Sequence, residues 1–310
     1  MGPRADRVLL GAAFLVLTAT PVVAGEAGDW LVRMDRALRE LDYEGRLVYV
    51  HGAAVQALQI THSAAGGQER LVALNGPIRE VTRDDAELVC PVPEVGTVAM
   101  ARPDVRGGGR GLLAVDPAHL GEAYEARLEG EARVAGRDAL VVALVPKDRL
   151  RYGHRLFLDA ESALPLKADL LDEAGMPRTQ VMFVSFEVRR GGKPAGESPV
   201  PSAPPIQDAT PLPLRLSSLP KGFRLAASAR RPLPGSGREL HYAVFSDGAT
   251  SVSLYVASPG HHDLQGRAEV GPVNAVGRRV GAYQVTAMGE VPPATLEAFV
   301  GAVDPAKGAQ

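Results

Sequence analysis

The chain is poor in cysteine, with Cys90 alone among 310 residues. A single cysteine cannot form a disulfide within the chain, so the core must be stable through packing alone. Cys90 lies in the apolar run 87–92. We interpret it as a buried, inert thiol, with a redox or intermolecular role as the alternative.

An excess of positive charge is also missing. The sequence holds 34 Lys and Arg against 36 Asp and Glu, for a formal net charge of −2. Such a balance gives no general platform for nucleic acid, and we expect no nucleic-acid partner.

Long apolar runs are absent beyond the N-terminus. There, Arg4 and Arg7 precede the apolar residues 8–17 and the small residues 18–24. This order predicts a secretory signal peptide over residues 1–24, cut after Ala24. An uncleaved anchor is the alternative, although the run is shorter than the roughly 20 residues of a membrane span. We expect a protein outside the cytoplasm that does not span a membrane.

Motifs of catalysis and metal binding are missing as well. None of the seven histidines has a partner at metal-ligand spacing, and the adjacent pair His261-His262 offers only a weak surface site. No G-x-S-x-G motif occurs. The glycine-rich run 107–111 lacks the Gly-Lys-Ser/Thr ending of a phosphate loop. We therefore predict no enzyme activity, no metal and no cofactor.

What the chain does have is a period of two. In residues 151–171, apolar side chains alternate with polar ones on both sides of a short turn at 159–162. This alternation predicts a hairpin of half-buried antiparallel strands. One apolar face carries Tyr152, His154, Leu156, Leu158, Leu164, Leu166, Ala168 and Leu170.

Similar short strands fill most of the chain before residue 190. The expected strands are 43–50, 55–62, 69–74, 78–83, 87–92, 124–134, 138–145 and 180–189. A helix is expected over 29–41, with Asp29 as its N-cap, and a short one over 117–123. Residues 91–113 are expected to form a long loop, and the role of its glycine-rich part, 103–113, is left open. The fold class is therefore mainly β (α+β), with a curved antiparallel sheet and few helices.

Residues 191–213 are rich in proline and predict an extended linker. This divides the chain into domains over 25–190 and 214–310. In the second we expect strands at 223–229, 240–246 and 251–258, with a hairpin at Asp247-Gly248. A further pair, 270–276 and 278–288, is placed around Gly277, and a helix over 295–303 closes this smaller antiparallel-sheet domain.

A curved sheet can leave an apolar concave face that accepts a ligand. The candidate lining residues are Leu156, Leu158, Leu166, Met182, Val184 and Phe186, the last three taken as one face of strand 180–189. The alternative for each is an ordinary core contact with the first helix.

Several stretches, in order along nearly the whole chain, resemble the MucB/RseB family. They include DWL at 29–31, LDYEG at 41–45, YGHRLFLD at 152–159, LPKGF at 219–223, HYAVFSDG at 241–248 and YQVT at 283–286. The glycine-rich run 107–111 departs from the family pattern.

The resemblance implies a periplasmic negative regulator of the envelope-stress sigma factor. Such proteins bind the periplasmic part of a single-span anti-sigma factor and shield it from proteolysis. It also implies a large domain similar to the LolA/LolB lipoprotein carriers, a half-open barrel, with lipid or lipopolysaccharide fragments as possible ligands. The alternatives are a periplasmic lipid or lipoprotein carrier and, more remotely, a hydrolase using His51 or His154.

Overall fold

The computed structural model describes residues 25–64, 68–76, 80–83, 88–92, 96–100, 115–189, 212–232, 238–260 and 263–304. The expected signal peptide, nearly all of the expected linker and the glycine-rich run 107–111 lie outside these residues. The side chain of Cys90 is also outside them, although its backbone belongs to strand β5 (Leu88–Val92).

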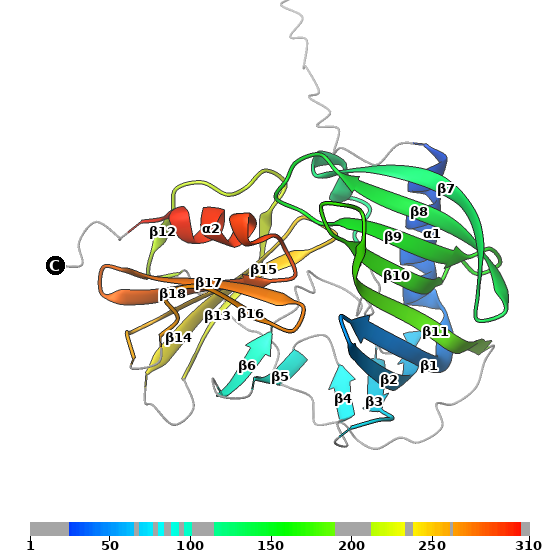
Figure 1. Ribbon diagram of the computed structural model, residues 1–310, viewed down its shortest axis with the longest axis horizontal. Coiled ribbons are helices and arrows are strands. Elements are labelled where there is room, and N and C mark those ends of the chain that lie inside the picture. Colours follow the sequence, from blue (N-terminus) through cyan, green and yellow to red (C-terminus); the bar gives the residue numbers. More distant parts are fainter. Residues whose placement is uncertain are drawn as a thin grey trace, which may run out of the picture.

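A nine-stranded antiparallel sheet forms the larger part of the molecule. Its strand order is β4-β3-β2-β1-β11-β10-β9-β8-β7, and the sheet curves without closing (Figure 1). Its strands are β1 (Asp42–His51), β2 (Ala54–Ser63), β3 (Gln68–Ala73), β4 (Glu80–Arg83), β7 (Tyr124–Val134), β8 (Arg137–Pro146), β9 (Gly153–Asp159), β10 (Pro165–Leu171) and β11 (Pro177–Arg189). The expected curved, mainly antiparallel fold is confirmed.

Helix α1 (Glu26–Glu40) lies across one face of this sheet (Figure 1). Its apolar side chains Leu31, Met34 and Leu38 pack into one core with strand residues such as Leu47 and Val142. Asp29 is not the N-cap. The helix begins three residues earlier, after Gly25, so that Asp29 lies in its first turn, where a carboxylate also suits the helix dipole.

The hairpin β9–β10 is fixed at its turn by Asp159. The Asp159 carboxylate accepts hydrogen bonds from Arg137 Nε at 2.7 Å and from the Ser162 hydroxyl at 2.6 Å. Burial alone would raise the pKa of Asp159, but these hydrogen bonds outweigh burial and lower it. The turn at 159–162 was therefore correctly expected from its polar residues.

The expected loop 91–113 is wrong in part. Residues Gly96–Met100 form strand β6, which pairs with β5 in a separate two-stranded sheet. The prolines at 91 and 93 had suggested a break in this segment, yet Pro91 lies within β5, an edge strand that tolerates a missing N–H.

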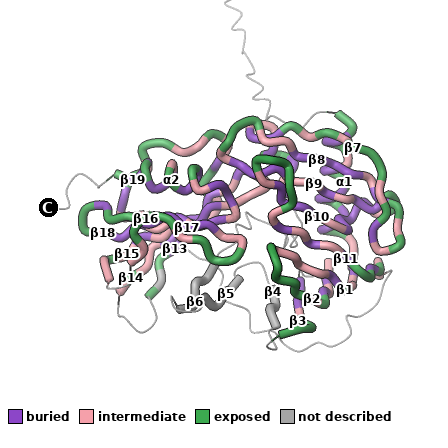
Figure 2. Tube along the Cα trace, viewed as in Figure 1, coloured by how far each residue is buried: buried purple, intermediate pink, exposed green. Residues whose placement is uncertain are grey.

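The second, smaller sheet has six strands in the order β13-β14-β15-β18-β17-β16. Its strands are β13 (Arg224–Pro232), β14 (Glu239–Ser246), β15 (Ser251–Ala257), β16 (Gly266–Val270), β17 (Val273–Val280) and β18 (Tyr283–Gly289). Helix α2 (Pro293–Gly301) packs on it through Leu296, Phe299 and Val300 (Figures 1 and 2). The strand β12 (Arg215–Leu216) pairs with β19 (Val303–Asp304). The smaller sheet with a C-terminal helix is as expected.

Gly277 does not separate two strands. It lies inside β17 opposite Gly266, and the turns fall at Gly271 and Gly281, each with φ of 58°. A Cβ on Gly277 would lie 2.2 Å from the Leu264 carbonyl oxygen, so this glycine allows a close backbone approach. The expected strand pair is therefore three strands.

Among the described helices, neither has the length and apolar character that crossing a membrane requires.

Candidate functional site

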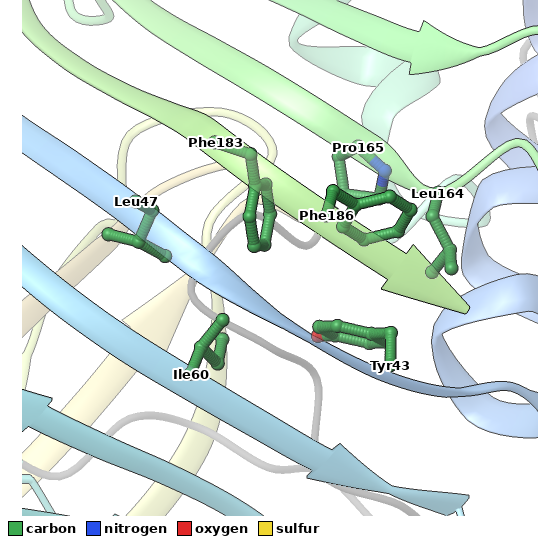
Figure 3. A pocket seen from close by; sticks show the side chains of 7 residues that line it. All are labelled: Tyr43, Leu47, Ile60, Leu164, Pro165, Phe183 and Phe186. Carbon is green, nitrogen blue, oxygen red and sulfur yellow. The ribbon is translucent and has the colours of Figure 1, made fainter. Parts of the chain in front are cut away.

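The face of the large sheet that α1 covers contains a small apolar cavity of about 10 Å³ (Figure 3). A space of that size holds about one water molecule. The walls come from the centre of the sheet and are formed by Tyr43, Leu47, Ile60, Leu164, Pro165, Phe183 and Phe186. In this conformation the side chains themselves fill the hollow of the curved sheet.

Three aromatic rings make up one wall of the cavity. The ring centroids of Phe183 and Phe186 lie 5.0 Å apart, and Tyr43 lies 6.5 Å and 6.0 Å from them. Edge-to-face and tilted rings at such distances attract each other beyond their shared burial. Gly45 makes room for this cluster, because a Cβ there would lie 2.8 Å from Phe183 Cδ1.

A polar row adjoins the aromatic wall. His62 stacks on Tyr43 with a centroid distance of 4.7 Å, and His62 is the cross-strand partner of both Tyr43 and Glu69. Both His62 and Glu69 are buried. Polar groups buried beside an apolar cavity are the usual means by which a site orients an amphiphilic ligand.

The structure places the six expected lining residues in different environments. Leu156, Leu158 and Leu166 are buried in the core shared with α1, and Phe186 lies in the cavity wall. Met182 is half-buried, and Val184 is 54% exposed. The six therefore do not line one surface, and their role in ligand binding stays a prediction.

A β-bulge in the pairing of β1 with β11 explains why the expected residues of β11 do not share one face. In the pairing of β1 with β11, Arg46 lies opposite Ser185 and Leu47 opposite Phe183, which leaves Val184 without a partner. The extra residue reverses the alternation, so that Phe183 and Phe186 both face the core. The expectation that Val184 and Phe186 share a face is therefore wrong.

Sequence reasoning missed Tyr43, Phe183 and His62 as neighbours of the cavity. Periodicity could have placed Tyr43 on an inward face of β1, but no local signal marks the bulge that turns Phe183 inward. The sequence marks His62 only as one of the seven histidines that could serve a metal or catalytic site. Among the residues that the structure describes, no group of three His, Cys, Asp or Glu side chains could hold a metal ion.

His154, once considered as a catalytic base, lies in the interior. Its ring meets the Tyr124 ring edge-on at 5.8 Å, and Nε2 is buried without a hydrogen-bond partner in the described part of the chain. Burial lowers the pKa of His154 to about 4. A neutral ring packed in this way contributes to the core.

A second buried site lies where the two sheets meet. Arg151 Nε donates to Asp247 Oδ2 at 2.6 Å, and both side chains are fully excluded from solvent. Arg151 precedes β9 of the large sheet, whereas Asp247 begins the turn between β14 and β15 of the small one. Tyr124 lies beside this pair, and burial together with the Asp247 carboxylate raises the pKa of Tyr124 well above its ordinary value.

The two sheets, with a nearly filled hollow in the larger one and a polar junction between them, make a mainly β protein of two parts. Residues 26–212 match the family model of the MucB/RseB N-terminal domain, and residues 209–304 match that of the MucB/RseB C-terminal domain. The chain belongs to the MucB/RseB family, as its sequence motifs suggested.

Curated relatives and solved structures agree with this membership. The sigma factor AlgU regulatory protein MucB of Pseudomonas aeruginosa is 31% identical over 328 residues, covering 98% of both chains. The sigma-E factor regulatory protein RseB of Escherichia coli (strain K12) is 26% identical over 294 residues, covering 91% of this chain and 92% of RseB. The P. aeruginosa MucA/MucB complex contains a chain with a TM-score of 0.68 and 29% identity, covering 91% of this chain and 99% of that one.

A second solved structure, MucB in complex with MucA(peri), gives a TM-score of 0.68 at 27% identity, with the same coverage. The relatives named here are regulatory proteins of sigma factors, and the likeness extends through both sheets.

Proposed function

We propose that this protein regulates an envelope-stress sigma factor by binding the periplasmic part of a single-span anti-sigma factor. The observation that carries the proposal is the likeness, over 91% of the chain, to MucB solved together with MucA. Both domains take part in this likeness, so the whole chain is the unit that we expect to bind.

The proposed place of action is the periplasm. The expected signal peptide over residues 1–24 would direct export. The balance of 34 basic and 36 acidic residues fits a protein partner better than nucleic acid.

Binding would shield the anti-sigma factor from the protease that begins its degradation, and lipid or lipopolysaccharide fragments would release it. Such a switch works only if the lipid binds the free regulator more tightly than the complex. The cavity beside Tyr43, Phe183 and Phe186 is the proposed entry point. Since it measures about 10 Å³ and ligand sites usually reach several hundred, an acyl chain must displace these rings.

A capture experiment tests the partner. The mature chain, residues 25–310, is immobilised and exposed to detergent-solubilised envelopes of the native organism, with heat-unfolded protein as the control. We expect the folded chain alone to retain the single-span anti-sigma factor. Lipid retained without that membrane protein would contradict the proposal and favour a lipid carrier.

A protection assay tests the shielding. The purified periplasmic domain of the anti-sigma factor is incubated with its initiating protease, with and without the mature chain. We expect slower cleavage with the chain and restored cleavage when lipopolysaccharide is added. Equal cleavage with and without the chain would contradict shielding, and continued protection in lipopolysaccharide would contradict lipid sensing.

A further inference from the structure

The two domains touch at several places, and the contacts around one buried ion pair are called the domain junction. Its members are Asp116, Leu150 and Arg151 of the N-terminal domain and Asp247, Gly248 and Thr295 of the C-terminal domain. At its centre, the ion pair of Arg151 and Asp247 joins residues 96 positions apart in the sequence.

Most contacts of Arg151 reach into the C-terminal domain. Besides Asp247, its guanidinium donates to the Lys221 carbonyl oxygen and lies 4.9 Å above the centre of the Phe223 ring. Asp148 is its partner within its own domain. The side chain has no exposed surface, and two of its three hydrogen-bond partners, Asp247 and Lys221, belong to the docked C-terminal domain.

Backbone groups complete the domain junction on both sides of this ion pair. The Asp116 N–H donates to the Gly248 carbonyl oxygen at 2.6 Å, and the Thr295 hydroxyl donates to the Leu150 carbonyl oxygen at 2.5 Å. Gly248 has φ of 98°, and a Cβ there would lie 2.9 Å from the Asp116 carbonyl oxygen. The β14–β15 turn thus fits against residue 116 only with glycine at its tip.

Exposed ion pairs surround the buried one. Arg224 lies 3.0 Å from Glu122 and Arg178 lies 2.9 Å from Glu269, each pair crossing between the domains. Exposed pairs contribute little to stability. Their contribution to stability can be compared, within the same protein, with that of the buried pair.

A buried ion pair favours one relative arrangement of its two partners more than it raises the stability of the fold. Removing two charges from water offsets most of their attraction, but burying one charge without the other is strongly unfavourable. Any rotation of the domains that separates Arg151 from Asp247 while both stay buried is therefore disfavoured. Only the docked arrangement, or a fully open one with both groups in water, avoids this cost.

We propose that Arg151 and Asp247 are positioning residues that hold the two domains in the single arrangement competent to bind the partner. This rests on the proposed function for its binding step. A partner that contacts both domains gains affinity when they are already arranged, because no orientational freedom is then lost on binding. Separating the domains would lower its affinity without changing any residue that touches it.

Amide hydrogen exchange of the free protein tests the domain junction without a partner. In Asp247→Asn and in Arg151→Met, the Asp116 amide should exchange at least tenfold faster than in the unsubstituted protein. Amides of the β8 core, such as those of Val142 and Leu144, should keep their rates, which shows that the fold persists. The matched control, Glu122→Gln, removes an exposed interdomain charge and should leave the Asp116 rate within twofold.

Affinity for the purified anti-sigma periplasmic domain is then measured with the same proteins. We expect at least tenfold weaker binding by Asp247→Asn and Arg151→Met, and recovery of most of the affinity in Arg151→Lys, which restores the charge. An unchanged Asp116 rate in both variants would overturn the proposal, as would faster exchange with unchanged affinity. If the unsubstituted protein binds no anti-sigma domain, the proposed function fails, whereas the exchange result still decides whether the domains are held by this pair.

Discussion

Arg151 and Asp247 form an ion pair that is fully excluded from solvent and joins the two domains, with Nε and Oδ2 2.6 Å apart. The expected proline-rich linker predicts two domains joined by an extended spacer. Direct docking through buried charges instead sets their relative arrangement, so the linker's length and stiffness matter less than this contact.

The energetic coupling of the pair can be measured. In a double-mutant cycle of Arg151→Met and Asp247→Leu, we expect the double variant to be more stable than the sum of the single effects predicts, by about 2 kcal/mol or more, because each single change leaves a buried charge unpaired. Unfolding in urea gives the four free energies.

The exposed pair Arg224 and Glu122 is the control for this cycle, and its coupling should stay below about 1 kcal/mol. Equal coupling energies in the two cycles would show that burying Arg151 and Asp247 does not make the stabilising effect of either side chain depend more strongly on the other.

Gly45 should tolerate no side chain. A Cβ there would lie 2.3 Å from the Ser185 carbonyl oxygen, so Gly45→Ala must push β11 away from β1 or move Phe183. We expect a loss of about 2–3 kcal/mol in the free energy of unfolding, typical of overpacking. Gly301→Ala at the end of α2, where nothing lies within 4 Å of the new methyl group, should be neutral or slightly stabilising. A neutral Gly45→Ala would contradict the close packing of these strands.

His154 should make the fold sensitive to acid. Its pKa is about 4 in the folded protein and ordinarily 6.5, so the unfolded chain takes up a proton between these values while the folded one does not. Its effect on stability is absent above pH 6.5 and grows as the pH falls toward 4. From pH 7.5 to pH 5 this costs about 2 kcal/mol.

The variant His154→Leu lacks that titration. Urea unfolding of both proteins across this pH range should show the unsubstituted protein losing about 2 kcal/mol more than the variant. If the free energies of unfolding of the two proteins change with pH in parallel, the His154 ring gains a proton without disturbing the fold.

A charge placed in the cavity wall tests whether this wall binds a ligand or is ordinary core packing. Leu156 is 1% exposed, and Leu156→Asp should unfold the N-terminal domain because a buried, unpaired carboxylate is costly. Phe186 lines the cavity, and the proposed lipid entry requires the wall to open there; a carboxylate could then reach water, so Phe186→Asp should fold and lose lipid binding. Circular dichroism and a lipid-binding assay measure both effects. Val184→Asp, at a 54% exposed position, should change neither. If Leu156→Asp and Phe186→Asp both unfold the domain, the proposal that this cavity wall binds lipid is wrong.

The sequence allowed the fold to be predicted where local chemistry decides it. Alternation and polar turn residues located the hairpin around Asp159 and the turn at Asp247-Gly248, since both depend on neighbours within a few positions. The residues of the candidate site were harder to predict from the sequence. The bulge at Val184 arises from pairing with β1, and Gly277 is needed by the approach of Leu264, so neither has a local signal.

The domain junction depends wholly on tertiary structure. The alternation places Arg151 at the start of a strand, but β9 begins two residues later at Gly153, whereas Asp247 is the turn residue that the sequence predicts. Their contact follows from how two separately folded sheets dock, which periodicity and spacing do not report.

Calorimetric titration of the mature chain with the purified periplasmic domain of the anti-sigma factor from the same genome tests the central claim most directly. We predict a saturable heat of binding that is absent when the anti-sigma factor's cytoplasmic domain is used instead. No heat and no complex on gel filtration, with a chain shown to be folded, would contradict the account.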